Sequence, residues 1–239
     1  MNYKFVLKLI LTMLAKIISN KFVSKYKLTH HLHLKLDKFL DDTKFPVVIA
    51  HGPAGTGKTT IICENSIKNL KNGIYEKIII TRPVISTEDD IGFLPGDLNE
   101  KMNPWLLPIF DIFYEYYTKN NVNEMVKNGI IEIAPFAFMR GRTFKKSIII
   151  ADEMQNSTPA QMKMLLTRLG DSSKIAITGD LEQQDLQTEE NGLYDLINLL
   201  NSKYNNKYEI YNDGFGIVEF NKNLVVRHEM VKKVLTLYE

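Results

Sequence analysis

The feature that most constrains this chain is a glycine-rich loop, Gly52-Pro-Ala-Gly-Thr-Gly-Lys-Thr59. An apolar run, residues 47–51, precedes it, and residues typical of a helix follow it. Glycines let backbone N–H groups turn inward around a phosphate, and the positive end of a following helix favours the same anion. The order strand, loop and helix therefore predicts a complete phosphate-binding loop for a nucleoside triphosphate.

Each residue type in this loop has a chemical task. The Lys58 ammonium can reach the β- and γ-phosphates, and the Thr59 hydroxyl can ligate Mg²⁺. The spacing of the three glycines does not fit the Gly-x-Gly-x-x-Gly pattern of dinucleotide-binding folds. The residues predicted to contact the nucleotide are Gly52, Pro53, Ala54, Gly55, Thr56, Gly57, Lys58, Thr59 and Thr60.

A second signal is the apolar run 147–151 followed by Asp152 and Glu153. An acid at the end of a parallel strand lies at the edge of the sheet where the phosphate loop also lies. Asp152 is expected to hold the Mg²⁺ shell, and Glu153 to orient and deprotonate the attacking water. Two adjacent acids favour hydrolysis over transfer to a bound acceptor. The competing interpretation is that the two acids begin a helix, and it is less favoured because the chain also contains the phosphate loop.

A third signal, Thr178-Gly-Asp-Leu-Glu-Gln183, also follows a strand-like run. A polar amide at this edge can sense a γ-phosphate and relay its loss, which is the role predicted for Gln183. A common turn has the same composition, so this motif supports nucleotide binding only in combination with the phosphate loop and the Asp152 strand.

Apolar runs rich in β-branched residues alternate with helix-like stretches, which predicts a doubly wound α/β fold with a mainly parallel sheet. The expected strands are 47–50, 77–81, 130–134, 147–151 and 174–178, and the expected helices are 58–69, 106–117, 159–169 and 192–201. At the C-terminus, residues 208–211 and 217–220 are expected to form a hairpin, followed by a helix from about residue 228 to 238.

Length and cysteine content narrow the class of protein. With 239 residues, one compact domain with an N-terminal extension is the simplest division: 1–36 and 37–239. The single cysteine, Cys63, excludes an intrachain disulfide framework and suits a reducing, cytoplasmic location. The five histidines lack a convincing ligand spacing, so no zinc site is predicted.

The N-terminal extension is strongly basic. Residues 1–36 contain seven lysines and no acid, so the remainder of this +2 chain is acidic. Polar residues recur every four positions between residues 4 and 20 against an apolar face, which predicts an amphipathic helix. The apolar stretch is too short and too often interrupted by lysine to span a membrane. Contact with an anionic membrane, with a partner or with the chain's own domain all remain open.

Together these motifs resemble the PhoH-like family of P-loop ATPases, relatives of superfamily 1 helicases. The resemblance rests on the phosphate loop and, in family order, on segments that begin at residues 81, 92, 134, 152, 161 and 226. It covers about residues 46–239 and implies a single RecA-like domain that binds ATP and Mg²⁺. Such proteins usually carry a glutamine or aromatic element upstream of the loop that reads adenine, and no glutamine precedes Gln155 here.

The resemblance also assigns roles. It implies Lys58, Thr59, Asp152 and Glu153 as nucleotide, magnesium and water-handling residues, Gln183 as a γ-phosphate sensor and Arg227 as an arginine-finger candidate. It suggests RNA or single-stranded DNA as partner.

Three further arginines are candidates for nucleic-acid or phosphate contact. Arg82 follows a strand, as in the helicase segment that touches single-stranded backbone, or it caps that strand. Arg140 and Arg142 flank a glycine ahead of the Asp152 strand and can contact phosphate or pair with local acids. The aromatic residues between 105 and 117 are expected to serve the core rather than to stack bases.

The leading hypothesis is an ATPase that couples hydrolysis to work on RNA or single-stranded DNA. A nucleotide-dependent switch or binding module without unwinding activity is the alternative, and a small-molecule kinase is a weaker third. Since one RecA-like lobe leaves its nucleotide open on one side, we expect a homo-oligomer in which a neighbour closes the site.

Overall fold

The computed structural model describes residues 24, 25, 28, 30–83, 98–182, 191–225 and 230, with the backbone alone for 98–105. Its helices are α2 (His31–Asp41), α3 (Lys58–Lys71), α4 (Leu98–Tyr114), α5 (Lys119–Lys127), α6 (Phe136–Met139), α7 (Pro159–Leu166), α8 (Gly192–Lys203) and α9 (Lys207–Asn212), with 3₁₀ turns η1 (Met154–Asn156) and η2 (Lys222–Leu224). Its strands are β1 (Val47–His51), β2 (Lys77–Thr81), β3 (Ile131–Ile133), β4 (Ser147–Ala151), β5 (Lys174–Gly179) and β6 (Phe215–Glu219).

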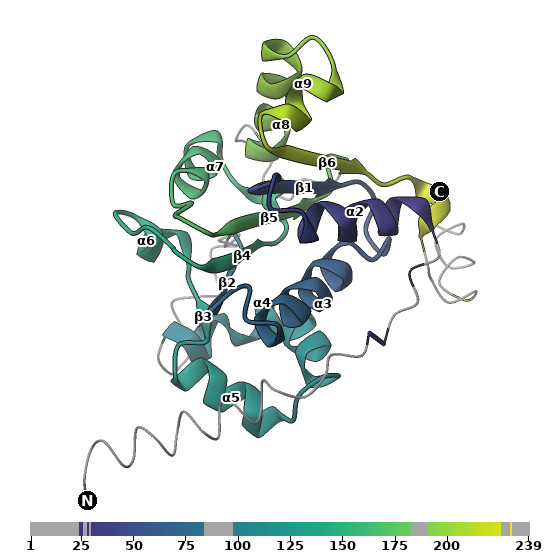
Figure 1. Cartoon of the computed structure of the whole chain (residues 1–239). Helices are drawn as coiled ribbons and strands as arrows, with labels where there is room; N and C mark the ends of the chain where they lie inside the picture. The colour runs from purple at the N-terminus through teal and green to yellow at the C-terminus, as the bar shows by residue number, and fades with distance from the viewer. Residues whose placement is uncertain are drawn as a thin grey trace, which may run out of the picture.

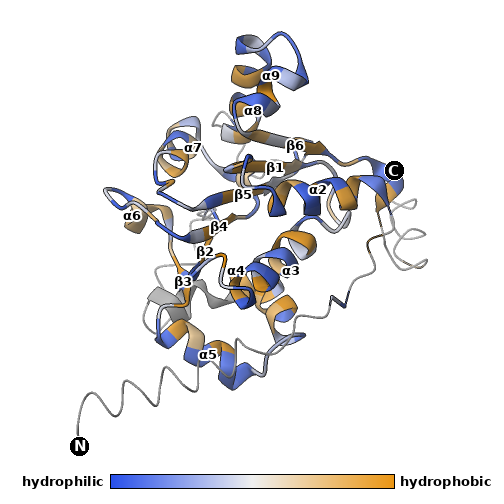
Figure 2. Cartoon of the chain, viewed as in Figure 1, coloured by the Kyte–Doolittle hydropathy of each residue, from blue (hydrophilic) through white to orange (hydrophobic). Residues whose placement is uncertain are grey.

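The six strands form one sheet in the order β3-β2-β4-β5-β1-β6, and every pair is parallel (Figure 1). Helices cover both faces, so the predicted α/β, RecA-like class is confirmed. Neighbouring strand residues point to opposite faces, as in any strand: Val48 faces a core built with α2, α3, α4 and α5, and Ile49 faces a core built with α6, α7, α8 and α9. Figure 2 shows hydrophobic colour on the central strands and mixed colour along the helices.

The predicted strands and helices are confirmed to within a few residues, except that α4 begins at Leu98, eight residues earlier than expected. Its aromatic residues serve the core, as expected, since Phe110, Phe113 and Tyr117 are all buried. The side chain of Trp105 lies outside the described residues, and so does the helix expected from about residue 228, apart from residue 230.

The predicted C-terminal hairpin is wrong. Residues 207–212 form helix α9, because the Asn206 side chain accepts hydrogen bonds from the backbone N–H groups of Tyr208 and Glu209. The strand that follows pairs parallel with β1, Val47 opposite Phe215, so its partner is remote in sequence. Local apolar pattern over so few residues does not separate a strand from a helical turn.

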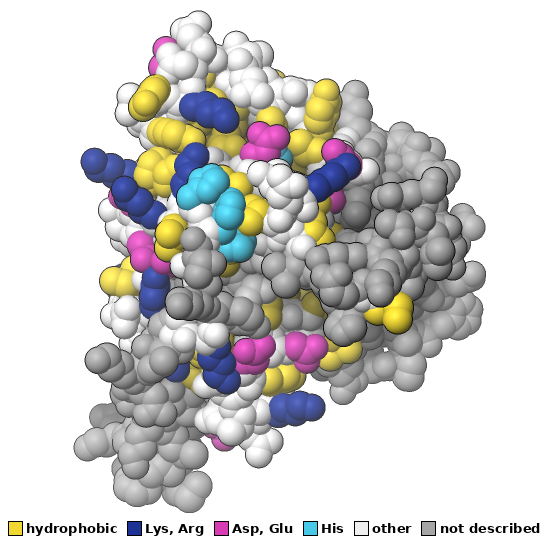
Figure 3. Space-filling view, turned by 90° about the vertical axis from the view of Figure 1, so that its right-hand side faces the viewer, with side chains coloured by type: hydrophobic (Ala, Val, Ile, Leu, Met, Phe, Trp, Pro, Cys, Tyr) yellow, Lys and Arg dark blue, Asp and Glu magenta, His cyan; other side chains and the backbone are white. Residues whose placement is uncertain are grey.

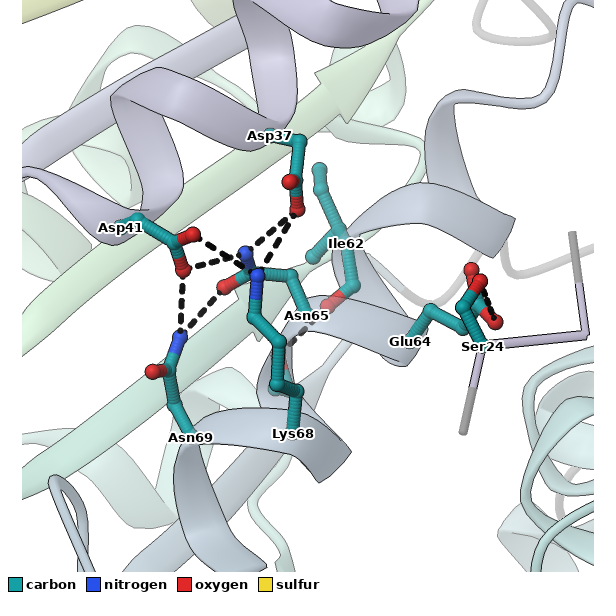
Figure 4. A network of polar contacts seen from close by, with 9 residues as sticks. Ser24, Asp37, Asp41, Ile62, Glu64, Asn65, Lys68 and Asn69 are labelled. Atoms are coloured by element: carbon teal, nitrogen blue, oxygen red, sulfur yellow. Dashed lines mark hydrogen bonds and ion pairs between the residues drawn. The ribbon is translucent and has the colours of Figure 1, made fainter. Parts of the chain in front are cut away.

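Helix α2 is bound to α3 by a polar network (Figure 4). The Asn65 Nδ2 atom donates to Oδ1 of both Asp37 and Asp41, at 2.8 and 2.9 Å. The Lys68 ammonium lies 2.8 Å from Oδ2 of Asp41. Leu36 and Leu40, on the same helix, are buried in the core. The expected boundary between residues 36 and 37 thus falls inside a helix that packs on the domain.

Candidate nucleotide-binding site

The phosphate loop connects β1 to α3, as the sequence predicts. Gly52, Gly55 and Gly57 all have positive φ angles, of 127°, 77° and 86°. A Cβ atom at Gly52 would lie 2.2 Å from the backbone oxygen of Phe220, so only glycine fits there. These backbone conformations, which side chains disfavour, give the loop its inward turn.

The Lys58 side chain lies across the loop it follows. Its Nζ donates to the carbonyl oxygens of Gly52 and Pro53, at 2.6 and 2.8 Å, and only 8% of the residue is exposed. Burial lowers the pKa of Lys58, and nearby carboxylates oppose that shift. Those carboxylates belong to Asp180, Glu153 and Asp152. A lysine held by loop carbonyls can exchange those bonds for the oxygens of a bound phosphate.

Asp152 joins the loop helix to the neighbouring strand. Its Oδ1 accepts hydrogen bonds from the hydroxyls of Thr59, at 2.8 Å, and Thr178, at 2.6 Å. The carboxylate is buried, with Oδ2 at 4.0 Å from a guanidinium nitrogen of Arg82. Hydroxyl and carboxylate oxygens side by side are the ligand type that Mg²⁺ prefers, so Thr59 and Asp152 fit the predicted metal.

Glu153 occupies a left-handed backbone conformation, with φ at 55°. Such strain in a residue with a side chain concentrates at functional sites. Its carboxylate accepts a hydrogen bond from Gln155 Nε2 at 2.6 Å, and Gln155 Oε1 accepts from the backbone N–H of Asp180 at 3.1 Å. Gln155 therefore connects the predicted base to the end of β5.

Two of these partners were missed as site residues by sequence reasoning. Thr178 stood out only as the start of a turn motif, and Gln155 only as part of a family segment. Their signal is positional: Thr178 is the last residue but one of β5, and Gln155 lies four residues after the end of β4, in the turn that follows Asp152.

His33 contacts the loop from the first turn of α2, and sequence reasoning missed it too. Its Nε2 lies 2.9 Å from the carbonyl oxygen of Thr56, a group that only accepts, so Nε2 carries the donated proton. The bond fixes the peptide plane between Thr56 and Gly57, whose N–H points away from that carbonyl. The ring also lies 5.6 Å from that of Phe220. Figure 3 shows histidine side chains, in cyan, gathered on this face of the molecule.

The three candidate arginines, Arg82, Arg140 and Arg142, have different surroundings in the structure. Arg82 lies at the site beside Asp152. Arg142 forms a hydrogen-bonded ion pair with Glu132 and lies 4.6 Å from the Phe144 ring centroid. Arg140 is exposed at the end of α6. Their contact with nucleic acid stays a prediction.

Gln183 and Arg227 lie outside the described residues. Among residues that are described, no helix is both long and apolar enough to cross a membrane.

Comparison with known proteins identifies the family to which this chain belongs. The family model for PhoH-like proteins matches residues 32–239. A PhoH-like protein of Bacillus subtilis is 43% identical over 194 residues, covering 81% of this chain and 58% of that protein. One from Synechocystis is 39% identical over 197 residues, covering 82% and 57%, and Protein PhoH of Escherichia coli K12 is 37% identical over 201 residues, covering 80% and 52%.

The chain thus spans about half the length of the curated relatives it matches. Among solved structures, the Pif1 helicase from Candida albicans aligns with a TM-score of 0.40 and 11% identity, over 90% of this chain and 45% of that one. That score is too low to add to what the parallel sheet itself shows. The family match, in contrast, covers most of the chain and includes the whole phosphate loop. The chain belongs to the PhoH-like protein family.

Proposed function

We propose that this protein is a cytoplasmic, magnesium-dependent ATPase that couples ATP hydrolysis to RNA or single-stranded DNA. The observation that carries the proposal is the link from Thr59 through Asp152 to Thr178, next to a loop lysine held by backbone carbonyls. This arrangement brings a triphosphate cradle, oxygen ligands for a metal and a strained glutamate to one edge of the sheet.

Each residue has one task in the proposed reaction. The loop N–H groups and Lys58 bind the phosphates, and Thr59 and Asp152 hold Mg²⁺, which when bound neutralises charge on the β- and γ-phosphates. Glu153 accepts a proton from the attacking water. Gln155 holds the Glu153 carboxylate in place through its amide.

A further part of the proposal concerns assembly. A neighbouring subunit in a homo-oligomer would close the site, and Arg227 would supply charge to it. Mixing inactive Lys58→Ala subunits with inactive Arg227→Ala subunits tests this, because action between subunits restores part of the activity. Exchanged oligomers that stay inactive, or a fully active monomer, would contradict it.

The experiment for the proposed function is a phosphate-release assay on the full chain with ATP and Mg²⁺, alone and with single-stranded RNA or DNA. We expect turnover that nucleic acid accelerates. Turnover that nucleic acid leaves unchanged would favour the nucleotide-dependent switch. A phosphorylated small-molecule product would favour a kinase.

A further inference from the structure

A second region with distinct chemistry lies at the opposite edge of the sheet from the phosphate loop. There a cavity of about 780 Å³ opens between α2, α9 and the segment 42–45 that leads into β1. We call it the aromatic–lysine groove, since three aromatic residues and three lysines line it: Phe39, Phe45, Tyr211, Lys35, Lys38 and Lys44.

The three aromatic rings of the groove pack against one another. The Phe39 ring centroid lies 4.5 Å from that of Phe45 and 5.3 Å from that of Tyr211. A Cβ atom at Gly216 would lie 2.9 Å from the Phe39 ring, so glycine on β6 admits that ring. Phe39 is buried, whereas Phe45 and Tyr211 are partly exposed, and the Lys35 ammonium lies 5.4 Å from the Tyr211 ring centroid.

Beneath the groove, Lys174 fixes the backbone that carries two of these rings. Its Nζ donates to the carbonyl oxygens of Phe39, Asp42 and Phe45, at 2.9, 2.8 and 2.7 Å. Three bonds from one buried ammonium hold the end of α2 and the segment after it. The floor is therefore built before any ligand arrives, which reduces the entropy cost of binding.

The charge of the groove is positive. Within the described part of the chain, no acid forms an ion pair with Lys35, Lys38 or Lys44. Lys35 donates to the Tyr211 hydroxyl at 3.0 Å, which aims its ammonium along the aromatic wall. The one acid in the lining, Asp42, has Oδ1 occupied by the backbone N–H of Lys44 at 2.9 Å.

We propose that the aromatic–lysine groove binds single-stranded nucleic acid, with phosphates on the lysines and a base against Phe45 and Tyr211. Bases stack on aromatic faces whatever their sequence. The lysines would attract any anion, but the aromatic rings beside them favour nucleic acid over an acidic protein, because bases add stacking that carboxylate side chains do not. This assignment rests on nucleic acid being the partner in the proposed function, and it names a surface remote from Arg82.

The test is fluorescence anisotropy of labelled oligo-U and oligo-dT, each about 12 nucleotides long, with the full chain. The groove variant is Lys38→Gln with Lys44→Gln. The matched control is Lys119→Gln with Lys127→Gln on α5, which removes the same charge from exposed lysines that have no ion pair in the described residues. Far-ultraviolet circular dichroism and ATP turnover without nucleic acid show that each variant is folded.

We expect the groove variant to bind both oligonucleotides more weakly and to flatten the slope of log affinity against log salt by about 1.4, the loss of two single-strand phosphate contacts. The control should keep the wild-type slope. Phe45→Leu keeps an apolar side chain but removes the ring, and it should weaken binding by roughly tenfold. If Phe45→Leu does not fold, the lysine pairs decide.

Three outcomes would overturn the assignment, and they are distinguishable. If groove and control variants bind alike while the wild type binds and is stimulated, the groove fails and the proposed function stands. If the wild type binds neither oligonucleotide, the nucleic-acid part of the proposed function fails with it. If poly-glutamate of equal length displaces the oligonucleotide as well as unlabelled oligo-U does, the partner is an acidic protein. A chain that binds through the groove but releases no phosphate leaves the groove standing and removes the ATPase.

Discussion

Two buried lysines at opposite edges of the sheet make nearly the same hydrogen bonds. Lys58 donates to the backbone carbonyls of Gly52 and Pro53, and 8% of it is exposed. Lys174 donates to three backbone carbonyls, including that of Phe39, and 2% of it is exposed. The bonds alone do not distinguish a binding lysine from a structural one.

The groups around each lysine distinguish the two roles. The acceptors of Lys58 belong to a glycine-rich loop next to the carboxylates of Asp152 and Glu153, so phosphate oxygens can replace them. The acceptors of Lys174 end helix α2 and precede β1, and no loop of that kind adjoins them. Burial lowers the pKa of Lys174 to about 8. We infer that Lys58 exchanges partners during function and that Lys174 keeps them.

Lys58→Ala is the variant for which we expect the largest effect, and it tests the difference between the two lysines. We expect ATP turnover to fall by at least roughly 10³-fold, because the phosphates lose a preorganised charge. The free energy of unfolding should change little, since water can replace Lys58 as the hydrogen-bond donor to the loop carbonyls. Phosphate release and urea unfolding measure the two effects, and normal turnover in the folded variant would exclude Lys58 from the site.

Lys174→Met should show the reverse pattern. Three carbonyls lose their donor, so we expect the free energy of unfolding to fall by about 3 kcal/mol, while turnover per folded molecule stays within about twofold. Urea unfolding followed by circular dichroism measures the loss. A variant of wild-type stability but low turnover would assign Lys174 to function instead.

Glu153→Gln tests the proposed site around Lys58 further, since glutamine keeps the shape of the side chain and removes only the predicted base. We expect turnover to fall by roughly 10²-fold or more while ATP still binds. Titration with a fluorescent ATP analogue checks binding separately from hydrolysis. Loss of binding would show that Glu153 is structural.

His33→Ala tests the contact from α2 to the phosphate loop. Without a donor to the Thr56 carbonyl, the peptide before Gly57 is less well oriented, so we expect the KM for ATP to rise about fivefold, a cost near 1 kcal/mol. The kcat should change less than the KM. Rescue by His33→Gln, which can also donate, would support orientation, and an equal fall in kcat would contradict it.

Asp41→Asn tests the far end of the same helix. Burial raises the pKa of Asp41, but hydrogen bonds from Lys68 and Asn65 outweigh that effect and hold the pKa below its ordinary value of 3.8. A carboxylate with a depressed pKa in the folded state adds stability above the unfolded pKa, and this stability is lost as the pH falls through the folded value.

The Asp41→Asn variant should therefore be slightly less stable than the wild type at neutral pH, by roughly 0.5 kcal/mol because solvent screens this half-exposed carboxylate, and the difference should shrink below about pH 4. Urea unfolding at both pH values measures it. An equal difference at both would mean that ionisation of Asp41 contributes nothing.

The comparison of the two lysines also shows what a sequence can predict. The position of Lys58 at the loop was predictable because its neighbours along the chain define the loop, and the positions of Asp152 and Glu153 because they follow a strand that ends beside the loop. Lys174 was expected only as the first residue of a strand, since its acceptors lie about 130 residues earlier. The contact of His33 with the loop and the parallel pairing of β6 with β1 were missed for the same reason: both depend on partners remote in sequence.

The central claim is that the loop, Asp152 and Glu153 form a working ATPase site. Phosphate release by the full wild-type chain at saturating ATP, with Mg²⁺ and again after EDTA, tests it most directly. We predict steady turnover with Mg²⁺ that EDTA abolishes and added Mg²⁺ restores, because the proposed site uses Mg²⁺ held by Thr59 and Asp152. A folded chain that binds ATP with Mg²⁺ but releases no phosphate, with or without single-stranded nucleic acid, would contradict it.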